Sequence, residues 1–428
     1  MKSKEIYVSM FLQVLILSFL LSFYVATVHT RSKNPELTDF YKFYKSAELF
    51  LKGKDIYSRI QFTPSFEYSQ KLTEKGKASL NTLHPNLNSP LLILSISPFA
   101  AIPFRIAFWS WSFLSLIIVF AVASSIPVSL SSAKNAVYKR AGLLILLLGY
   151  FPIWVNFLLG QYGLVLLGLV FSLWLASRQG KQRTAGLILG VAMSLKIFLG
   201  LFLVFYAVRK QWRIIVWCVG IFAILNILGF MIFGFSAYKQ HISLLSNSAL
   251  YINASWNASL AGFFSRIFGG AENIPFINMP IITSGIVYSF SLLLILALIW
   301  ISRPLSNEAS GDRFDLGFSL VIVSMLLISP FGWIYYFPIL IIPLVICWRV
   351  CSKLPSRKIF YGVIAVAWIT SSIPTNLINS EEVAMNNPMV WFVDAGFYFY
   401  SLVIFCFIIL TINYRAYSRK DIAQTIAS

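Results

Sequence analysis

The sequence predicts an all-α, polytopic transmembrane bundle, and three observations lead to this fold class. Hydrophobic residues occupy 58% of the 428 positions and charged residues only 11%, whereas about 25% of an ordinary soluble domain is charged. Apolar runs long enough to cross a hydrocarbon core of ~30 Å as helices recur along the chain. Basic residues gather in the short segments between these runs. We expect about 10–12 membrane segments, given the length that a bilayer requires of each.

The net charge of +19 indicates orientation in a membrane and not nucleic-acid binding. Short loops with an excess of Lys and Arg remain on the cytoplasmic side of a membrane. The loops with this excess are 131–140, 178–183, 209–213, 303–315 and 349–358. The sequence therefore predicts a multi-pass protein of the plasma (inner) membrane with both termini in the cytoplasm, and no nucleic-acid partner.

The chain divides into three parts. Residues 1–28 form a first span, whose apolar run is longer than the ~7–15-residue core of a cleaved signal peptide. Residues 29–89 are too polar for lipid, so they form an outer loop. Residues 90–428 form a multi-span domain, in which a second outer loop covers 234–280.

Two apolar segments of the multi-span domain do not fit a simple crossing. Basic loops flank 184–208 on both sides, which a single crossing cannot satisfy if both loops are cytoplasmic. We expect this segment to be a re-entrant pair of half-helices. We expect 91–102 to be a short helix that dips into the membrane before a full span.

The first outer loop contains an amphipathic helix. Between Thr38 and Gly53, apolar side chains recur at helical spacing on one face, which is typical of a helix lying on the membrane surface. Thr38 or Asp39 caps its start and Gly53 ends it. Asp39 is therefore either a helix cap or a carboxylate at the lip of the membrane, where it could serve as a general base.

Two polar residues of the multi-span domain are candidates for ligand binding. Gln161 lies in a short outer turn after Gly160, where its amide offers a donor and an acceptor to a hydroxylated ligand; a plain tight turn is the alternative. Lys196 lies in the middle of the run 184–208. An unpaired lysine there costs roughly 2.5–3.5 kcal/mol, which favours the binding of an anion over a purely structural role.

The segment Ser329-Pro330-Phe331-Gly332-Trp333-Ile334-Tyr335-Tyr336 joins two spans on the outer side. Its aromatic side chains are either part of an interfacial aromatic belt or contacts for a substrate. Four cysteines without a CxxC pair, with only three histidines in the chain, favour neither a disulfide framework nor a metal site.

These segments, in this order, resemble glycosyltransferase family 87, the GT-C-type transferases that use polyprenyl-phosphate sugars. The resemblance covers approximately residues 35–350. The positions that carry it are Asp39, Phe40, Tyr44, Ala47, Gly53, Tyr57, Pro90, Leu91, Pro98, Pro103, Trp109, Gly160, Gln161, Gly186, Gly190, Lys196, Arg209, Trp212, Arg213, Ser329, Pro330 and Trp333. One position departs from the pattern, because the family often continues Trp-Asp-His-Tyr where this chain has Trp333-Ile334-Tyr335-Tyr336.

The resemblance implies a GT-C-like bundle and a hexosyltransferase of the outer membrane face. Such an enzyme moves a sugar, commonly mannose, with inversion from a polyprenyl-phosphate donor within the membrane lipid to the hydroxyl of a glycolipid or glycan acceptor. It implies Asp39 as the catalytic base and a substrate-binding set made of Tyr44, Gln161, Lys196, Trp333 and Tyr335. We expect no cofactor, and the absence of a paired Asp-x-Asp in the outer loop predicts no metal.

Two other classes remain as alternatives. A secondary transporter needs ionisable residues in several spans, and only Lys196 clearly qualifies here. A polysaccharide ligase or flippase also handles lipid-linked sugars on the outer face, and only the motif set above distinguishes this alternative from family 87.

Overall fold

The structure is a computed structural model that describes residues 2–57, 86–130, 136–246, 256–269, 279–304, 311–374 and 396–418, with the single positions 252, 254 and 277. Within these residues every regular element is a helix, and an isolated bridge between Asn257 and Trp333 is the β feature found there. The predicted all-α class is confirmed.

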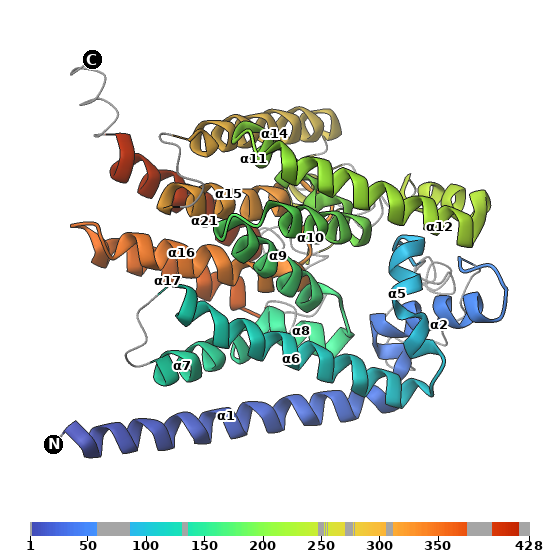
Figure 1. Ribbon diagram of the computed structural model, residues 1–428, viewed down its shortest axis with the longest axis horizontal. Coiled ribbons are helices and arrows are strands. Elements are labelled where there is room, and N and C mark those ends of the chain that lie inside the picture. The colour runs from blue at the N-terminus through green and yellow to red at the C-terminus, as the bar shows by residue number, and fades with distance from the viewer. Residues whose placement is uncertain are drawn as a thin grey trace.

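Figure 1 shows the helices as a bundle with two distinct ends. Helix α1 (Lys2–Lys33) forms one edge and packs against α6 (Phe104–Leu130), α7 (Ala136–Leu148) and α8 (Phe151–Leu159). At the end opposite the start of α1 lie α2 (Asp39–Leu51) and α5 (Pro90–Ala100). The remaining helices are α9 (Gly163–Arg178), α10 (Gln182–Leu195), α11 (Leu201–Val208), α12 (Trp212–Ser246), α13 (Leu260–Phe268), α14 (Pro280–Ser302), α15 (Asp312–Ile328), α16 (Ile341–Cys351), α17 (Arg357–Ser372) and α21 (Gly396–Asn413).

Among the described residues, six helices are long and apolar enough to cross a membrane, and a seventh span results if the bent pair 140–148 and 151–159 counts as one. Shorter apolar helices cover 90–100, 163–178 and 197–208. The chain is therefore a multi-pass membrane protein. The larger number of membrane segments stays a prediction.

Two helices extend past their predicted ends. The first span was predicted to end at residue 28, but α1 continues to Lys33, because no helix-breaking residue occurs before Pro35. The second outer loop was predicted to begin at 234. There Gly234 (φ 72°) bends α12, which then continues as a second arm to Ser246. The parts of both loops at 58–85, 247–251 and 270–276 lie outside the described residues.

The segment 182–208 is broken at the lysine that the sequence analysis singled out. Helix α10 ends at Leu195, Lys196 is extended (φ −144°, ψ 105°), and a short 3-10 helix, η2 (Ile197–Gly200), leads into α11. Arg178, which precedes α10, forms an ion pair with Asp315 at 3.2 Å. Arg209, which follows α11, also lies within electrostatic range of Asp315. Both ends of the segment thus lie near Asp315, and its re-entrant course in the membrane stays a prediction.

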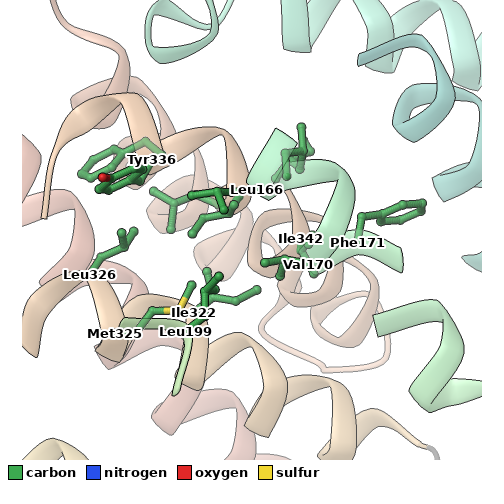
Figure 2. Close-up of a cluster of buried hydrophobic side chains, with 14 of the residues drawn as sticks. Leu166, Val170, Phe171, Leu199, Ile322, Met325, Leu326, Tyr336 and Ile342 are labelled. Atoms are coloured by element: carbon green, nitrogen blue, oxygen red, sulfur yellow. The ribbon is translucent and has the colours of Figure 1, made fainter. Parts of the chain in front are cut away.

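The core joins helices from distant parts of the chain (Figure 2). Buried side chains of α9, η2, α15, α16 and the 3-10 segment η4 (Ile334–Leu340) pack together there. Those labelled in Figure 2 are Leu166, Val170, Phe171, Leu199, Ile322, Met325, Leu326, Tyr336 and Ile342. Tyr336 also borders the candidate site, so the core fixes one wall of it.

Candidate active site

Helix α2 (Asp39–Leu51) begins with a cap that is Thr38 and not Asp39. The Thr38 side chain accepts a hydrogen bond from the Tyr41 backbone N–H at 3.3 Å, and its backbone is extended. After Lys52 the chain turns at Gly53, whose positive φ of 65° ends the helix as predicted. Of the two predicted caps, the structure uses Thr38, and the Asp39 carboxylate makes contacts of another kind.

The apolar face of α2 packs against protein. Phe40, Phe43, Tyr44 and Ala47 are buried, and the neighbours of the helix are α5 (Pro90–Ala100) and α6. The Tyr44 hydroxyl donates to the backbone oxygen of Ile102 at 2.9 Å. Tyr44 therefore holds α2 in place, and its contact with a sugar stays a prediction.

The Asp39 carboxylate joins α2 to the turn that contains Gln161. Its Oδ1 accepts a hydrogen bond from Lys42 Nζ at 2.7 Å, and its Oδ2 accepts one from Gln161 Nε2 at 2.6 Å. Gln161 is only 6% exposed. The structure thus brings together two predicted site residues that lie far apart in the sequence, and Gln161 fixes the orientation of the carboxylate.

Glycines let the Gln161 turn approach both of its neighbours. Gly160 ends α8 at φ 68°, and a Cβ there would lie 2.5 Å from the Cβ of Phe40 on α2. A Cβ on Gly163 would lie 1.7 Å from the backbone oxygen of Tyr335. Asn156 Nδ2 donates to that same oxygen at 2.9 Å. The turn is therefore fitted between α2 and η4 with no room for side chains at either glycine.

Trp333, Tyr335 and Tyr336 form an aromatic strip beside Asp39. The Trp333 and Tyr335 rings stack with centroids 6.0 Å apart, and the Tyr335 and Tyr336 centroids are 4.7 Å apart. The Tyr335 phenol lies within electrostatic range of both Tyr336 and Asp39. The middle of the strip therefore lies near the carboxylate, and its two ends at Trp333 and Tyr336 lead away from it.

The second outer loop holds the start of this strip in place. The Asn257 side chain is fully buried, donates to the Pro330 backbone oxygen at 2.8 Å and accepts from the Gly332 N–H at 2.8 Å. Ile334 N donates to the Trp256 backbone oxygen at 3.1 Å. These contacts fix the segment that carries Trp333.

Lys196 lies at the far end of the strip. Its Nζ donates to Asn88 Oδ1 at 2.6 Å and lies 5.6 Å from the centroid of the Tyr336 ring. Among the residues that the structure describes, no carboxylate lies within ion-pair distance of Lys196. Its positive charge is therefore held by a neutral amide and an aromatic face, a setting in which an anion can bind.

The structure thus connects five of the six predicted site residues. Asp39 and Gln161 are in direct contact, and Tyr335 links them to Trp333 on one side and, through Tyr336, to Lys196 on the other. Tyr44 stands apart. Asn88, Tyr57 and His241 around Lys196 were not predicted, because they come from separate segments without a common local pattern. The resemblance to the family pattern at Tyr57 was the one available signal.

Comparison with known proteins identifies the family. The sequence model of glycosyltransferase family 87 matches residues 86–330, which include Gln161 and Lys196 but neither Asp39 and Tyr44 before them nor Trp333 and Tyr335 after them. The "polyprenol-phosphate-mannose-dependent alpha-(1-2)-phosphatidylinositol mannoside mannosyltransferase" of Mycobacterium tuberculosis is 24% identical over 297 residues, and the match covers 65% of this chain and 66% of that protein. Because the family match spans more than half of the sequence, the chain belongs to glycosyltransferase family 87, as its motifs predicted.

Proposed function

We propose that this membrane glycosyltransferase moves a hexose from a polyprenyl-phosphate donor to an acceptor hydroxyl on the outer face of the membrane, with inversion at the sugar. The observation that carries the proposal is the Asp39 carboxylate, held by Gln161 near Tyr335 in the middle of the aromatic strip, while the Tyr336 end of the strip lies against the ammonium group of Lys196. A base for the acceptor proton and a cation for the leaving phosphate are what a single displacement requires.

The reaction balances with these two groups. The acceptor oxygen attacks C1 of the sugar, the bond from C1 to the phosphate oxygen breaks, and its electron pair leaves with the polyprenyl monophosphate. The acceptor proton passes to a carboxylate oxygen of Asp39. Gln161 orients the carboxylate through the hydrogen bond to Oδ2, and its amide oxygen can accept from a sugar hydroxyl.

Lys196 supports the other half of the reaction. Negative charge on the phosphate increases as the bond to C1 breaks, and a cation fixed in a low-dielectric site stabilises that charge without rearrangement. The aromatic rings of Trp333 and Tyr335 offer flat, apolar surfaces of the kind on which a sugar can pack. Tyr335, which replaces the histidine of the family pattern, contributes a hydroxyl there and no imidazole.

The substrates follow by analogy with the relative. The name of the Mycobacterium protein gives a polyprenol-phosphate-mannose donor and a phosphatidylinositol mannoside acceptor. We propose the same donor class here, with mannose as the first sugar to test and a glycolipid or glycan as the acceptor. In this proposal the termini face the cytoplasm and Asp39 faces outwards.

The decisive experiment separates catalysis from helix stability at Asp39. With purified protein and labelled polyprenyl-phosphate mannose, Asp39→Asn should lower transfer by about 10²–10⁴-fold, because an amide cannot accept the proton. Its unfolding temperature should hardly change, because the cap is Thr38 and a partly exposed ion pair such as that with Lys42 contributes at most ~1 kcal/mol.

Two variants on the same helix serve as controls. Glu48→Gln changes another carboxylate, whose pKa is held below its ordinary value by hydrogen bonds from Lys45 and Lys52, and it should retain transfer. Thr38→Ala removes the cap and should destabilise the protein by about 1 kcal/mol while the carboxylate stays in place. Near-normal transfer by a folded Asp39→Asn variant would show that the base lies elsewhere.

A further inference from the structure

We infer that His241 binds the donor phosphate together with Lys196, and that the two residues form one phosphate subsite. This inference rests on the proposed function, because the phosphate is that of the lipid-linked donor. It adds a residue that none of the sequence motifs contains and that comes from the second outer loop region.

The bend in α12 places His241 against Tyr57, whose hydroxyl contacts the same residue, Asn88, as Lys196 does. Beyond Gly234 the second arm of α12 carries His241, whose ring stacks on Tyr57 with centroids 5.9 Å apart and planes 17° apart. The Tyr57 hydroxyl donates to the Asn88 backbone oxygen at 2.7 Å, and the Asn88 side chain accepts from Lys196 at 2.6 Å. His241 and Lys196 lie within electrostatic range of each other.

The imidazole of His241 has an unused polar atom. Its Nδ1 is buried, and within the described part of the chain no atom hydrogen-bonds it. A buried polar atom without a partner is unfavourable, and an acceptor atom of a bound ligand would satisfy it. When Nδ1 carries the proton, it donates one hydrogen bond, whatever the state of Nε2.

The charges around His241 favour an anion. Lys196 contributes a positive charge within electrostatic range, and burial raises the pKa of Tyr57, so that its hydroxyl stays neutral while it donates to Asn88. The described residues place no carboxylate in contact with Lys196 or His241. A phosphate oxygen would accept from both Lys196 Nζ and His241 Nδ1, and charge-assisted hydrogen bonds of this kind are the strong ones.

Binding of the reaction product tests the subsite without any transfer. Labelled polyprenyl monophosphate is titrated into the full chain in lipid nanodiscs. His241→Phe keeps a ring to stack on Tyr57 but removes the donor, and it should weaken binding about 10- to 100-fold. His241→Asn keeps an N–H near the position of Nδ1, and its affinity should stay within about threefold of the wild-type value, by the same hydrogen-bond reasoning.

Controls distinguish the outcomes. His29→Phe changes an exposed histidine of α1 and should leave binding unchanged. Inorganic phosphate should compete with the lipid if the headgroup alone is recognised, and failure to compete would show that the polyprenyl chain is recognised as well.

Unchanged binding by His241→Phe, or equal loss in the Phe and Asn variants when both are folded, overturns the role of His241. Failure of the wild-type protein to bind polyprenyl monophosphate would instead contradict the proposed donor class.

Discussion

At the scale of single residues, Lys196 is the clearest test of the donor site. Lys196→Met removes the charge from a half-buried position and keeps a long apolar side chain, so the protein should fold and insert. Loss of a hydrogen bond to a charged group should weaken donor binding about 10- to 100-fold. Equilibrium binding of the polyprenyl-phosphate sugar measures the effect.

A matched lysine provides the control for this variant. Lys181 is exposed in the loop that precedes α10, and Lys181→Met should leave donor binding unchanged. If Lys196→Met binds the donor as well as the wild type, the contacts of Lys196 with Asn88 and Tyr336 are structural.

Hydropathy and spacing identify Lys196 as a candidate site residue, because a lysine in the middle of an apolar run is evident from the sequence alone. They identify Asp39 as a candidate but leave its role open, and only the contact of Thr38 with the Tyr41 N–H decides which residue caps the helix. His241 could not be predicted in this way. Its neighbour Tyr57 is remote in sequence, and their stacking depends on how α12 bends at Gly234.

At the scale of elements, the turn between α8 and α9 gives a prediction with an internal control. Gly160 and Gly180 both have φ 68°, but a Cβ on Gly160 would meet Phe40 and Phe108, whereas Gly180 has nothing within 4 Å. Gly180→Ala should cost only the ~1–2 kcal/mol of a left-handed alanine. Gly160→Ala should cost more and lower transfer, because it pushes Gln161 away from Asp39.

Thermal unfolding and transfer, measured on both variants, check this prediction. Equal unfolding temperatures and equal transfer in the two variants would show that the close approach of the turn to α2 does not matter. The sequence could predict the positive φ of Gly160, since glycine is common at helix ends. It could not predict the crowding by Phe40, because that residue lies on a helix far away in the chain.

Element boundaries illustrate the same limit. The break at 196 in the segment 182–208 follows from charge, because two basic flanks exclude a single crossing. The extension of α12 to Ser246 does not follow from hydropathy. The second arm is less apolar than the first, so its sequence predicts a loop. Local apolarity predicts the first arm of α12, and it does not predict that the helix continues beyond Gly234.

At the scale of the whole molecule, charge clusters define one end of the bundle. Asp315 is fully buried and bonds to Trp174, Arg178 and Arg349, so that it ties α9, α15 and α16 together. Figure 1 shows the start of α1 at this end and α2 at the other. The positive excess predicts that the Asp315 end faces the cytoplasm and that Asp39 faces outwards.

Labelling of single cysteines with a membrane-impermeant maleimide tests this orientation in intact cells. The four native cysteines are buried, so the background should be low. Lys54→Cys, exposed just after α2, should be labelled from outside, whereas the exposed positions of Lys181→Cys and Lys358→Cys should react only after the membrane is permeabilised. Labelling of Lys181→Cys from outside would reverse the orientation and assign the acceptor to the cytoplasmic face. The contacts of Asp39 with Gln161 would remain as they are, so that result would change where the sugar is transferred and leave the chemistry of the transfer intact.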